Sequence, residues 1–246
     1  MSRYVFRFTK YGDMRFISHL DLQRLFRRMF KRIKVELSYS QGYNPHPKVN
    51  IAQPLSLGFE SESEYLEIET EKQYDINDVL EKGNEALPQG IALIAGLEAV
   101  SSPKNLSSIV EYAEYAVFLP TNGQPVPMER LALFNSQKSI IVNKRDKKSK
   151  KMVERDVKHL VHQLRWTEVD ERGLMIHAVL RAATNEALNP MLLVESLCEA
   201  IRIPFEKELC RVVRRDLYRL IDGTLVPLLD CCGSVKEETD EKRKEE

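Results

Sequence analysis

The pattern of apolar and polar positions in the first hundred residues predicts strands and helices in a definite order. Residues 3–10 alternate Tyr4, Phe6 and Phe8 with Val5 and Arg7, as a strand does. Apolar residues then recur every three or four positions, which is the spacing of an amphipathic helix. Further elements follow: short strands at 35–40 and 48–53, a loop at 54–63, a half-exposed strand at 65–69, a helix at 76–87 and a strand at 91–100. This order is typical of a ferredoxin-like βαββαβ unit.

The second half repeats the order with a longer central section. Strands are expected at 112–119, 139–143, 174–183 and 209–213, helices at 128–135 and 189–203, and strand or mixed structure at 153–166. We therefore predict an α+β protein of two ferredoxin-like (βαββαβ) units side by side, with antiparallel sheets and helices on one face. The expected domains are residues 1–102 and 108–222. Residues 234–246 are charged and predict a disordered tail.

The first helix is expected to begin after Ser18, whose hydroxyl suits an N-cap, with Asp21 favourable in the first turn. Its apolar stripe consists of Leu22, Leu25, Phe26, Met29 and Ile33. Its other positions are almost all cationic: Arg24, Arg27, Arg28, Lys31, Arg32 and Lys34. Because like charges on one helix repel each other, this face is expected to meet an anion or an acidic segment.

A rigid bend follows, in which Pro45 and Pro47 flank His46. Proline cannot lie inside a helix or a central strand, so the imidazole should be displayed. Aromatic, amide, imidazole and guanidinium groups together suit unpaired bases and phosphates. The sequence therefore predicts an RNA-binding surface made of Arg15, Arg24, Arg27, Arg28, Lys31, Arg32, Tyr43, Asn44, His46 and Lys48. A structural turn, in which Tyr43 packs down and Asn44 caps the backbone, is the alternative.

The formal net charge is zero, but the charges are segregated along the chain. Residues 1–50 carry eleven Lys and Arg against three Asp and Glu, whereas residues 51–100 carry two against eleven. Residues 138–165 carry ten against three, around an expected hairpin turn at 146–149. The basic blocks favour a polyanionic partner. The rival interpretation is that the acidic block folds onto the basic helix and neutralises it.

Other function classes lack their sequence signatures. The chain has no glycine-rich phosphate loop, no Gly-x-Ser-x-Gly elbow and no Cys-x-x-Cys pair. His159 and His162 have no accompanying cluster of carboxylates or cysteines, so we expect no metal and no cofactor. No apolar run approaches the ~20 residues of a membrane span, and the first residues lack a signal-peptide pattern. We expect a cytoplasmic protein with its four cysteines reduced.

Three groups of residues resemble one known family. They are the run from Arg15 to Leu22 (RFISHLDL) with Arg27-Arg28, the run from Gly42 to Pro47 (GYNPHP) followed by Ala52-Gln53-Pro54-Leu55, and the run from Arg214 to Tyr218 (RRDLY). These residues resemble the radical SAM-linked proteins, the DUF2344 family. The resemblance implies a partner, a radical SAM protein with a B12-binding domain, and work on RNA or the ribosome. The radical SAM three-cysteine motif itself is absent from this chain.

The leading hypothesis is an RNA-binding accessory protein of a radical SAM/B12 protein, acting in tRNA or rRNA modification or processing. One alternative is a metal-independent endoribonuclease. In that mechanism His46 or His19 would act as general base, and Arg15, Arg24 or Arg28 would stabilise the charged phosphorane. Another alternative is a non-catalytic module whose basic face docks an acidic protein.

Overall fold

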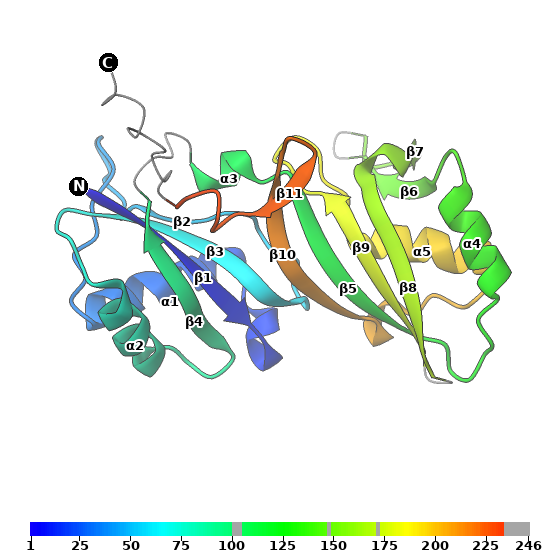
Figure 1. The fold of residues 1–246 in the computed structure, drawn as a ribbon, viewed down its shortest axis with the longest axis horizontal. Coiled ribbons are helices and arrows are strands. Elements are labelled where there is room, and N and C mark those ends of the chain that lie inside the picture. The colour runs from blue at the N-terminus through cyan, green and yellow to red at the C-terminus, as the bar shows by residue number, and fades with distance from the viewer. Residues whose placement is uncertain (100–104, 147–148, 171–172, 234–246) are drawn as a thin grey trace, which may run out of the picture.

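The computed structural model describes residues 1–99, 105–146, 149–170 and 173–233 (Figure 1). The expected boundary at residue 102 and the expected disordered tail at 234–246 lie outside the described residues. Within the described part, no helix is long and apolar enough to cross a membrane.

The described residues form one continuous nine-stranded sheet in the order β4-β1-β3-β10-β5-β9-β8, with β2 beside β3 and β11 beside β10. The strands are β1 (Ser2–Lys10), β2 (Val49–Ile51), β3 (Glu60–Thr70), β4 (Ile91–Glu98), β5 (Tyr112–Pro120), β8 (Val161–Asp170), β9 (Gly173–Arg181), β10 (Arg211–Ile221) and β11 (Thr224–Pro227). Neighbouring strands are antiparallel except where β10 meets β3. A separate two-stranded ribbon consists of β6 (Ile141–Arg145) and β7 (Met152–Asp156).

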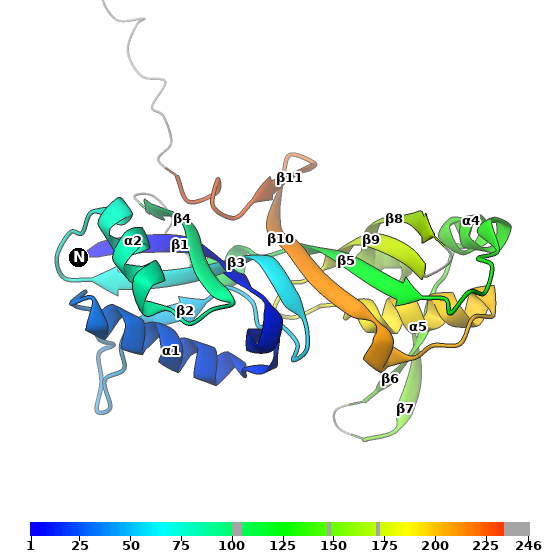
Figure 2. The ribbon, with the colours of Figure 1, turned by 90° about the horizontal axis from the view of Figure 1, so that it is seen from below.

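The helices are α1 (His19–Arg32), α2 (Ile76–Ala86), α3 (Leu106–Ile109), α4 (Met128–Ser136) and α5 (Pro190–Ile201), with 3-10 turns η1 (Gly12–Phe16), η2 (Lys158–Leu160) and η3 (Lys207–Leu209). In Figure 2, α1 and α5 lie on the same side of the sheet. The predicted α+β class is confirmed. Where two sheets were expected, however, both halves contribute to a single sheet.

The apolar face of α1 packs into the hydrophobic core, as its amphipathic pattern predicted. Leu22, Phe26 and Met29 are buried, and Leu25 and Ile33 are partly buried against the same cluster. The Phe26 ring meets Phe8 of β1 edge-on, with ring centroids 4.8 Å apart.

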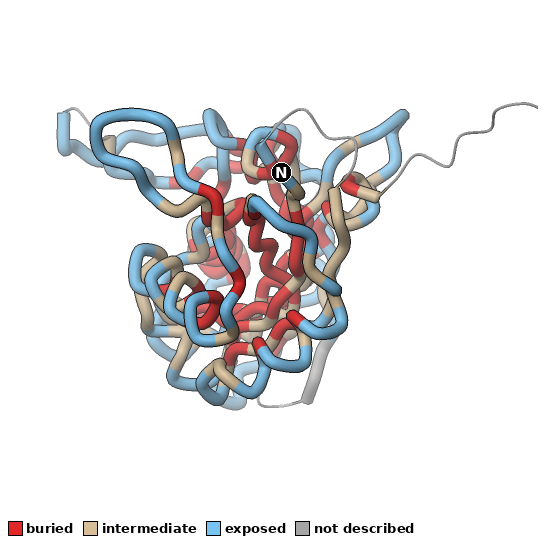
Figure 3. The backbone as a smooth tube through the Cα atoms, turned by 90° about the vertical axis from the view of Figure 1, so that its left-hand side faces the viewer, coloured by how far each residue is buried: buried red, intermediate tan, exposed pale blue. Residues whose placement is uncertain are grey.

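Phe30 also belongs to this face, although the predicted stripe omitted it. It is fully buried and its ring lies 6.2 Å from that of Phe6. Figure 3 shows buried backbone running through the middle of the molecule, with exposed segments around it.

The acidic strand β3 differs from its prediction in length and in burial. It begins at Glu60, inside the segment expected to be a loop, and Glu60, Glu64 and Glu67 are buried. Strand alternation predicted a half-exposed strand because a single sequence does not reveal what lies on its outer face. In the fold β3 is central, with β1 on one side and β2 and β10 on the other, and cationic side chains cover its carboxylates.

Two other elements also differ from their predictions. The expected strand at 35–40 is reduced to two isolated bridges, Leu37 with Thr70 and Tyr39 with Pro47. The last expected strand, 209–213, is the beginning of β10, which continues to Ile221 and pairs with both β5 and β11. The charged run from Arg214 to Asp216 interrupts the apolar pattern, so the sequence alone indicated an end to the strand.

Strands β3 and β10 meet through a short parallel contact that joins the two halves. Val213 and Arg214 lie opposite Glu60 and Ser61. The Arg214 side chain is 1% exposed; its Nε donates to Glu64 Oε1 at 2.7 Å, and Nη2 donates to Glu64 Oε2 and to the Gln53 carbonyl. These hydrogen bonds to a buried carboxylate fix the second half against the first.

The Tyr65 hydroxyl forms a second link across this junction. It donates to Asp216 Oδ1 at 2.5 Å, and the same oxygen accepts the Leu217 N–H at 2.7 Å. Burial raises the pKa of the Asp216 carboxyl above its usual range, and the hydrogen bonds from Tyr65 and Leu217 act in the opposite direction. The polar side chains of the junction are therefore satisfied from both halves of the chain.

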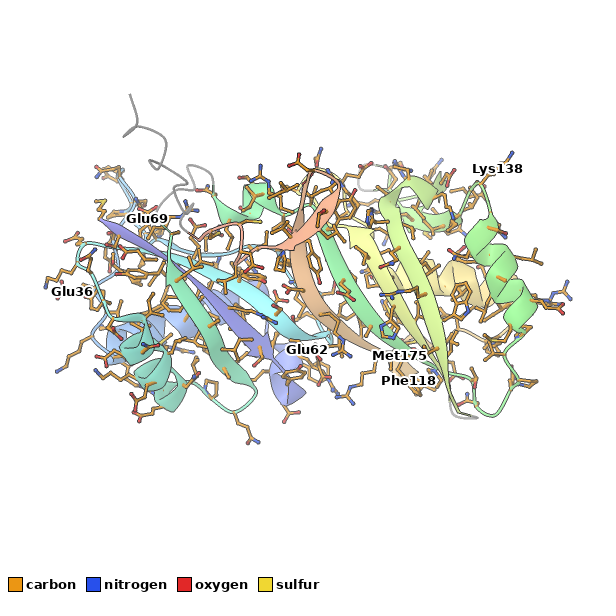
Figure 4. All side chains as sticks on the ribbon, in the orientation of Figure 1. Glu36, Glu62, Glu69, Phe118, Lys138 and Met175 are labelled. Atoms are coloured by element: carbon orange, nitrogen blue, oxygen red, sulfur yellow. The ribbon has the colours of Figure 1, made fainter. Side chains whose placement is uncertain are left out.

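We predict that Glu64→Gln lowers the free energy of unfolding by about 3–5 kcal/mol, because it leaves the Arg214 guanidinium buried without its counter-charge. The matched control is Glu62→Gln, near the same junction (Figure 4), which removes the partner of the half-exposed Arg215 and should cost less than ~1 kcal/mol. Urea unfolding measures both values, and equal losses for the two variants would contradict the assigned role of the buried pair.

Candidate nucleic-acid interface

The exposed face of α1 carries the predicted cations in two groups. Arg24 and Arg32 have partners within the chain: Arg24 Nη1 lies 2.9 Å from Asp21 Oδ1, and Arg32 Nη1 donates to the Ala86 carbonyl at 3.2 Å. Arg27, Arg28 and Lys31 form no ion pair or side-chain hydrogen bond with any residue that the structure describes. These three side chains are the part of the helix whose charge the described chain leaves uncompensated.

The acidic block does not neutralise this face. The carboxylates of β3 pair elsewhere: Glu60 with Arg15 and Arg211, Glu64 with Arg214, Glu67 with Arg3, and Glu69 with Lys48. Arg15 and Lys48, both predicted to bind RNA, are thus held by the protein's own glutamates. The Arg15 guanidinium lies 3.6 Å from Glu60 and also over the Phe16 ring, 4.7 Å from its centroid.

The proline bend is a short loop closed by backbone hydrogen bonds. Lys48 N donates to the Ser38 carbonyl at 2.8 Å, Ser40 N donates to the His46 carbonyl at 2.9 Å, and His46 N donates to Ser40 Oγ at 3.0 Å. The tip from residue 41 to residue 46 is exposed, and the Tyr43 side chain is fully open to solvent. In Figure 2 the bend projects beyond α1 on the helix side of the sheet. Tyr43 therefore does not pack down.

A groove of about 650 Å³ joins the end of α1 to the base of the bend. We call it the basic groove, and its lining includes Arg27, Arg28, Lys31, Lys34, Glu36, Tyr39 and Pro47. Glu36 is paired with Lys72 at 3.0 Å, so the lining cations outnumber the available carboxylates. Tyr39, whose side chain is 54% exposed, was missed by the sequence analysis. Tyr39 reaches the groove because its backbone pairs with that of Pro47 when the bend closes, and the sequence alone does not indicate this pairing.

The N-cap of α1 forms as predicted. Ser18 Oγ accepts the Asp21 N–H at 3.1 Å and donates to Asp21 Oδ2 at 2.7 Å. The Ser18 hydroxyl and then Arg24 hold the pKa of the Asp21 carboxyl below its usual range. This cap fixes where the helix begins and so sets which side chains reach the basic groove.

His19 and His46 lie at opposite ends of α1, which is ~20 Å long at 1.5 Å per residue. Burial lowers the pKa of the His19 imidazole, Lys10 lowers it further, and Glu64 opposes the shift. The ring of His46 is exposed and makes no hydrogen bond or ion pair with the described residues. The two candidate bases therefore cannot act in one site.

Lys10 marks a polar cluster that the sequence analysis missed. Its side chain is buried, and Nζ donates to the carbonyls of Arg15 and Ile17 at 3.4 and 3.3 Å. Burial lowers the pKa of the ammonium, and neighbouring Glu64 raises it. Lys10 ends an alternating strand, and no local pattern indicated that its side chain would turn inward.

The described residues contain no group of three or more His, Cys, Asp or Glu that could hold a metal ion. His159 Nε2 lies 3.3 Å from Glu186 Oε1, whereas the His162 ring lies tilted beside that of Tyr112, with ring centroids 5.0 Å apart. All four cysteines are free thiols, and burial raises the pKa of Cys198 to about 12.

Comparisons with known proteins give a family and a fold. The family model described as "Uncharacterized protein conserved in bacteria (DUF2344)" matches residues 3–190. A search of curated proteins found no match. A chain in the crystal structure of a Cbf5-Nop10-Gar1 complex is similar, with a TM-score of 0.51 and 10% identity over 87% of this chain and 48% of that chain.

At that identity the likeness concerns the fold alone, and this chain spans about half of the matched one. A glycine cleavage system transcriptional repressor described as putative also aligns, at 12% identity over 87% of this chain and 98% of that chain, with a TM-score of 0.26.

We predict that the pKa of His19 lies below its ordinary value of about 6.5, because burial removes water that would stabilise the charged form of the ring. The unfolded chain then binds the proton more readily than the folded protein. The stability due to neutral His19 is present above pH ~6.5 and is lost as the pH falls through the folded-state pKa. NMR titration measures the midpoint, and His19→Asn should flatten this part of the stability profile. A midpoint at or above 6.5 would show that burial does not control the ring.

Proposed function

Because the chain belongs to the DUF2344 family over residues 3–190, we propose that it is an RNA-binding accessory protein of a radical SAM/B12 protein, acting on tRNA or rRNA. The partner and the class of RNA come from the resemblance of its sequence motifs. RNA binding is supported by the basic groove, and one observation carries it: Arg27, Arg28 and Lys31 converge there without an acidic partner among the described residues.

The unpaired cations matter because they repel one another. Cations clustered on one helix face destabilise that face unless an anion compensates them. The nearest carboxylates in sequence, Asp21 and Glu36, pair with Arg24 and Lys72. The carboxylates of β3 are likewise occupied by other cations. A phosphate backbone supplies closely spaced negative charges and releases its counterions when lysine and arginine bind it.

The aromatic side chains favour RNA over an acidic protein surface. Tyr39 lies in the groove and Tyr43 is fully exposed at the tip of the bend, with Asn44 and His46 beside it. An exposed ring beside cations can stack on an unpaired base, and an amide can bond its edge.

We also propose that the chain consists of two ferredoxin-like units. The strand orders β4-β1-β3-β2 and β10-β5-β9-β8, each antiparallel, support two ferredoxin-like units. The units are joined along β3 and β10, and the ribbon β6–β7 is an insertion in the second. This arrangement places the basic groove on the first unit, with α1.

We predict that Arg27→Glu with Arg28→Glu abolishes RNA binding, because two attractive contacts become repulsive at the centre of the groove. The control is Lys138→Glu with Lys207→Glu, which reverses two exposed charges away from α1 and should change affinity little. Fluorescence anisotropy with labelled cellular tRNA and rRNA fragments measures both, from 50 to 200 mM salt.

Affinity of the unaltered protein should fall steeply over that salt range. If the Arg27 and Arg28 changes leave RNA binding intact but break a complex with the radical SAM protein, the groove is a protein-docking surface and the RNA proposal is wrong.

A further inference from the structure

The ribbon β6–β7 stands apart from the main sheet and is exposed along most of its length. Val142 is its one buried residue between positions 141 and 156 within the described part of the chain. Ser196 of α5 donates from Oγ to the Ile141 carbonyl at 2.8 Å, and Ile140 N donates to Asp156 Oδ1 at 3.0 Å. A two-stranded ribbon is marginally stable alone, so these anchors at its base hold it in place.

Cations outnumber carboxylates in the sequence of the ribbon, and three of its described lysines have no side-chain partner. Residues 141–156 include seven Lys and Arg against three Asp and Glu. Lys144, Lys150 and Lys151 form no ion pair or side-chain hydrogen bond with the described residues.

The ribbon's aspartates are occupied instead by neighbouring groups. Asp156 accepts the backbone N–H groups of Lys158 and Ile140, which lower its pKa. Asp146 accepts the Ser149 N–H at 2.7 Å and lies 3.8 Å from Arg155. A cleft of about 590 Å³ at the base of the ribbon is lined in part by Lys144, Arg145, Arg155 and His159.

The ribbon and the bend project from the same side of the molecule. Figure 2 shows both on the side of the sheet that α1 and α5 cover. Strands β10, β5 and β9 separate β3 from β8, so an RNA that contacts both projections has to cross the junction between the two halves of the sheet.

The two surfaces differ in chemistry. The basic groove and bend combine cations with Tyr39 and Tyr43, whereas residues 141–156 contain no aromatic residue. Its exposed apolar side chains are Ile141, Met152 and Val153. A cationic surface without aromatic rings contacts phosphates well but lacks the aromatic stacking that favours unpaired bases. Paired RNA presents mainly its phosphates and 2′-hydroxyls.

We infer that the RNA is a stem-loop, whose unpaired nucleotides bind the basic groove and whose paired stem lies with its phosphates against the ribbon β6–β7. This inference rests on the proposed function and extends it from RNA in general to a folded RNA that spans both halves. Lys144 and Lys151 are the ribbon residues that meet the stem, and binding at two sites on one RNA increases the total affinity.

The test compares a stem-loop of ten paired bases with its isolated loop as a four-nucleotide single strand. Lys144→Glu with Lys151→Glu should weaken stem-loop binding about tenfold or more and reduce the magnitude of the salt slope by about two, one for each phosphate that the variant no longer neutralises. The same variant should bind the four-nucleotide strand as the unaltered protein does. Glu154→Lys, which adds a cation to the ribbon, should strengthen stem-loop binding only.

The control is Lys207→Glu with Arg219→Glu, which reverses two exposed charges outside residues 138–165 and outside the basic groove and should not change the affinity for either RNA. Circular dichroism and thermal melting establish that each variant is folded. Stem-loop binding that is unchanged in the ribbon variant overturns the inference. If Arg27→Glu with Arg28→Glu still abolishes binding in that case, the proposed function stands without the ribbon. If a folded ribbon variant binds both RNAs equally less well, the stem-loop inference is also overturned. If the unaltered protein binds no RNA, both the inference and the proposed function are wrong.

Discussion

The Arg214 guanidinium and the Glu64 carboxylate are buried together where β3 meets β10, and the rest of the architecture depends on that contact. The parallel backbone pairing there is short, covering Val213 and Arg214 against Glu60 and Ser61. A paired buried charge is costly to separate, so the two halves are held in one arrangement. Tyr65 and Asp216 add a second polar link across the same junction. The continuous sheet follows from these contacts.

That junction also determines how charge is distributed over the surface. Strand β3 carries five of the eleven acidic residues of the block, and four of these carboxylates pair with Arg3, Arg214, Arg211, Arg15 and Lys48. The cations of α1 are consequently left without those partners, although the chain as a whole has no net charge. A balanced composition is thus compatible with a locally basic surface, because the carboxylates of β3 are paired in the middle of the sheet while Arg27, Arg28 and Lys31 remain unpaired among the described residues.

The rigid junction gives the two basic surfaces a fixed relation to each other. The bend is closed by backbone hydrogen bonds at its base, and the ribbon is anchored through Ser196 and Asp156. Both project from the side of the sheet that the helices cover. Under the proposed function, this placement would reduce the entropy lost when one RNA contacts both surfaces.

The sequence by itself determined the α+β class, the start of α1 at Ser18, the burial of its apolar stripe and the exposure of the bend. These features depend on local spacing, capping and proline geometry, which neighbours in the chain decide. Only the tertiary structure decided that β3 is central, that β10 continues through Arg214 to Ile221, and that Lys10 turns inward. It also separated Arg27, Arg28 and Lys31 from Arg15 and Lys48, which looked equivalent in sequence. The physical reason is that charge pairing and strand neighbours join residues up to about 150 positions apart, and a single sequence carries no local signal of such contacts.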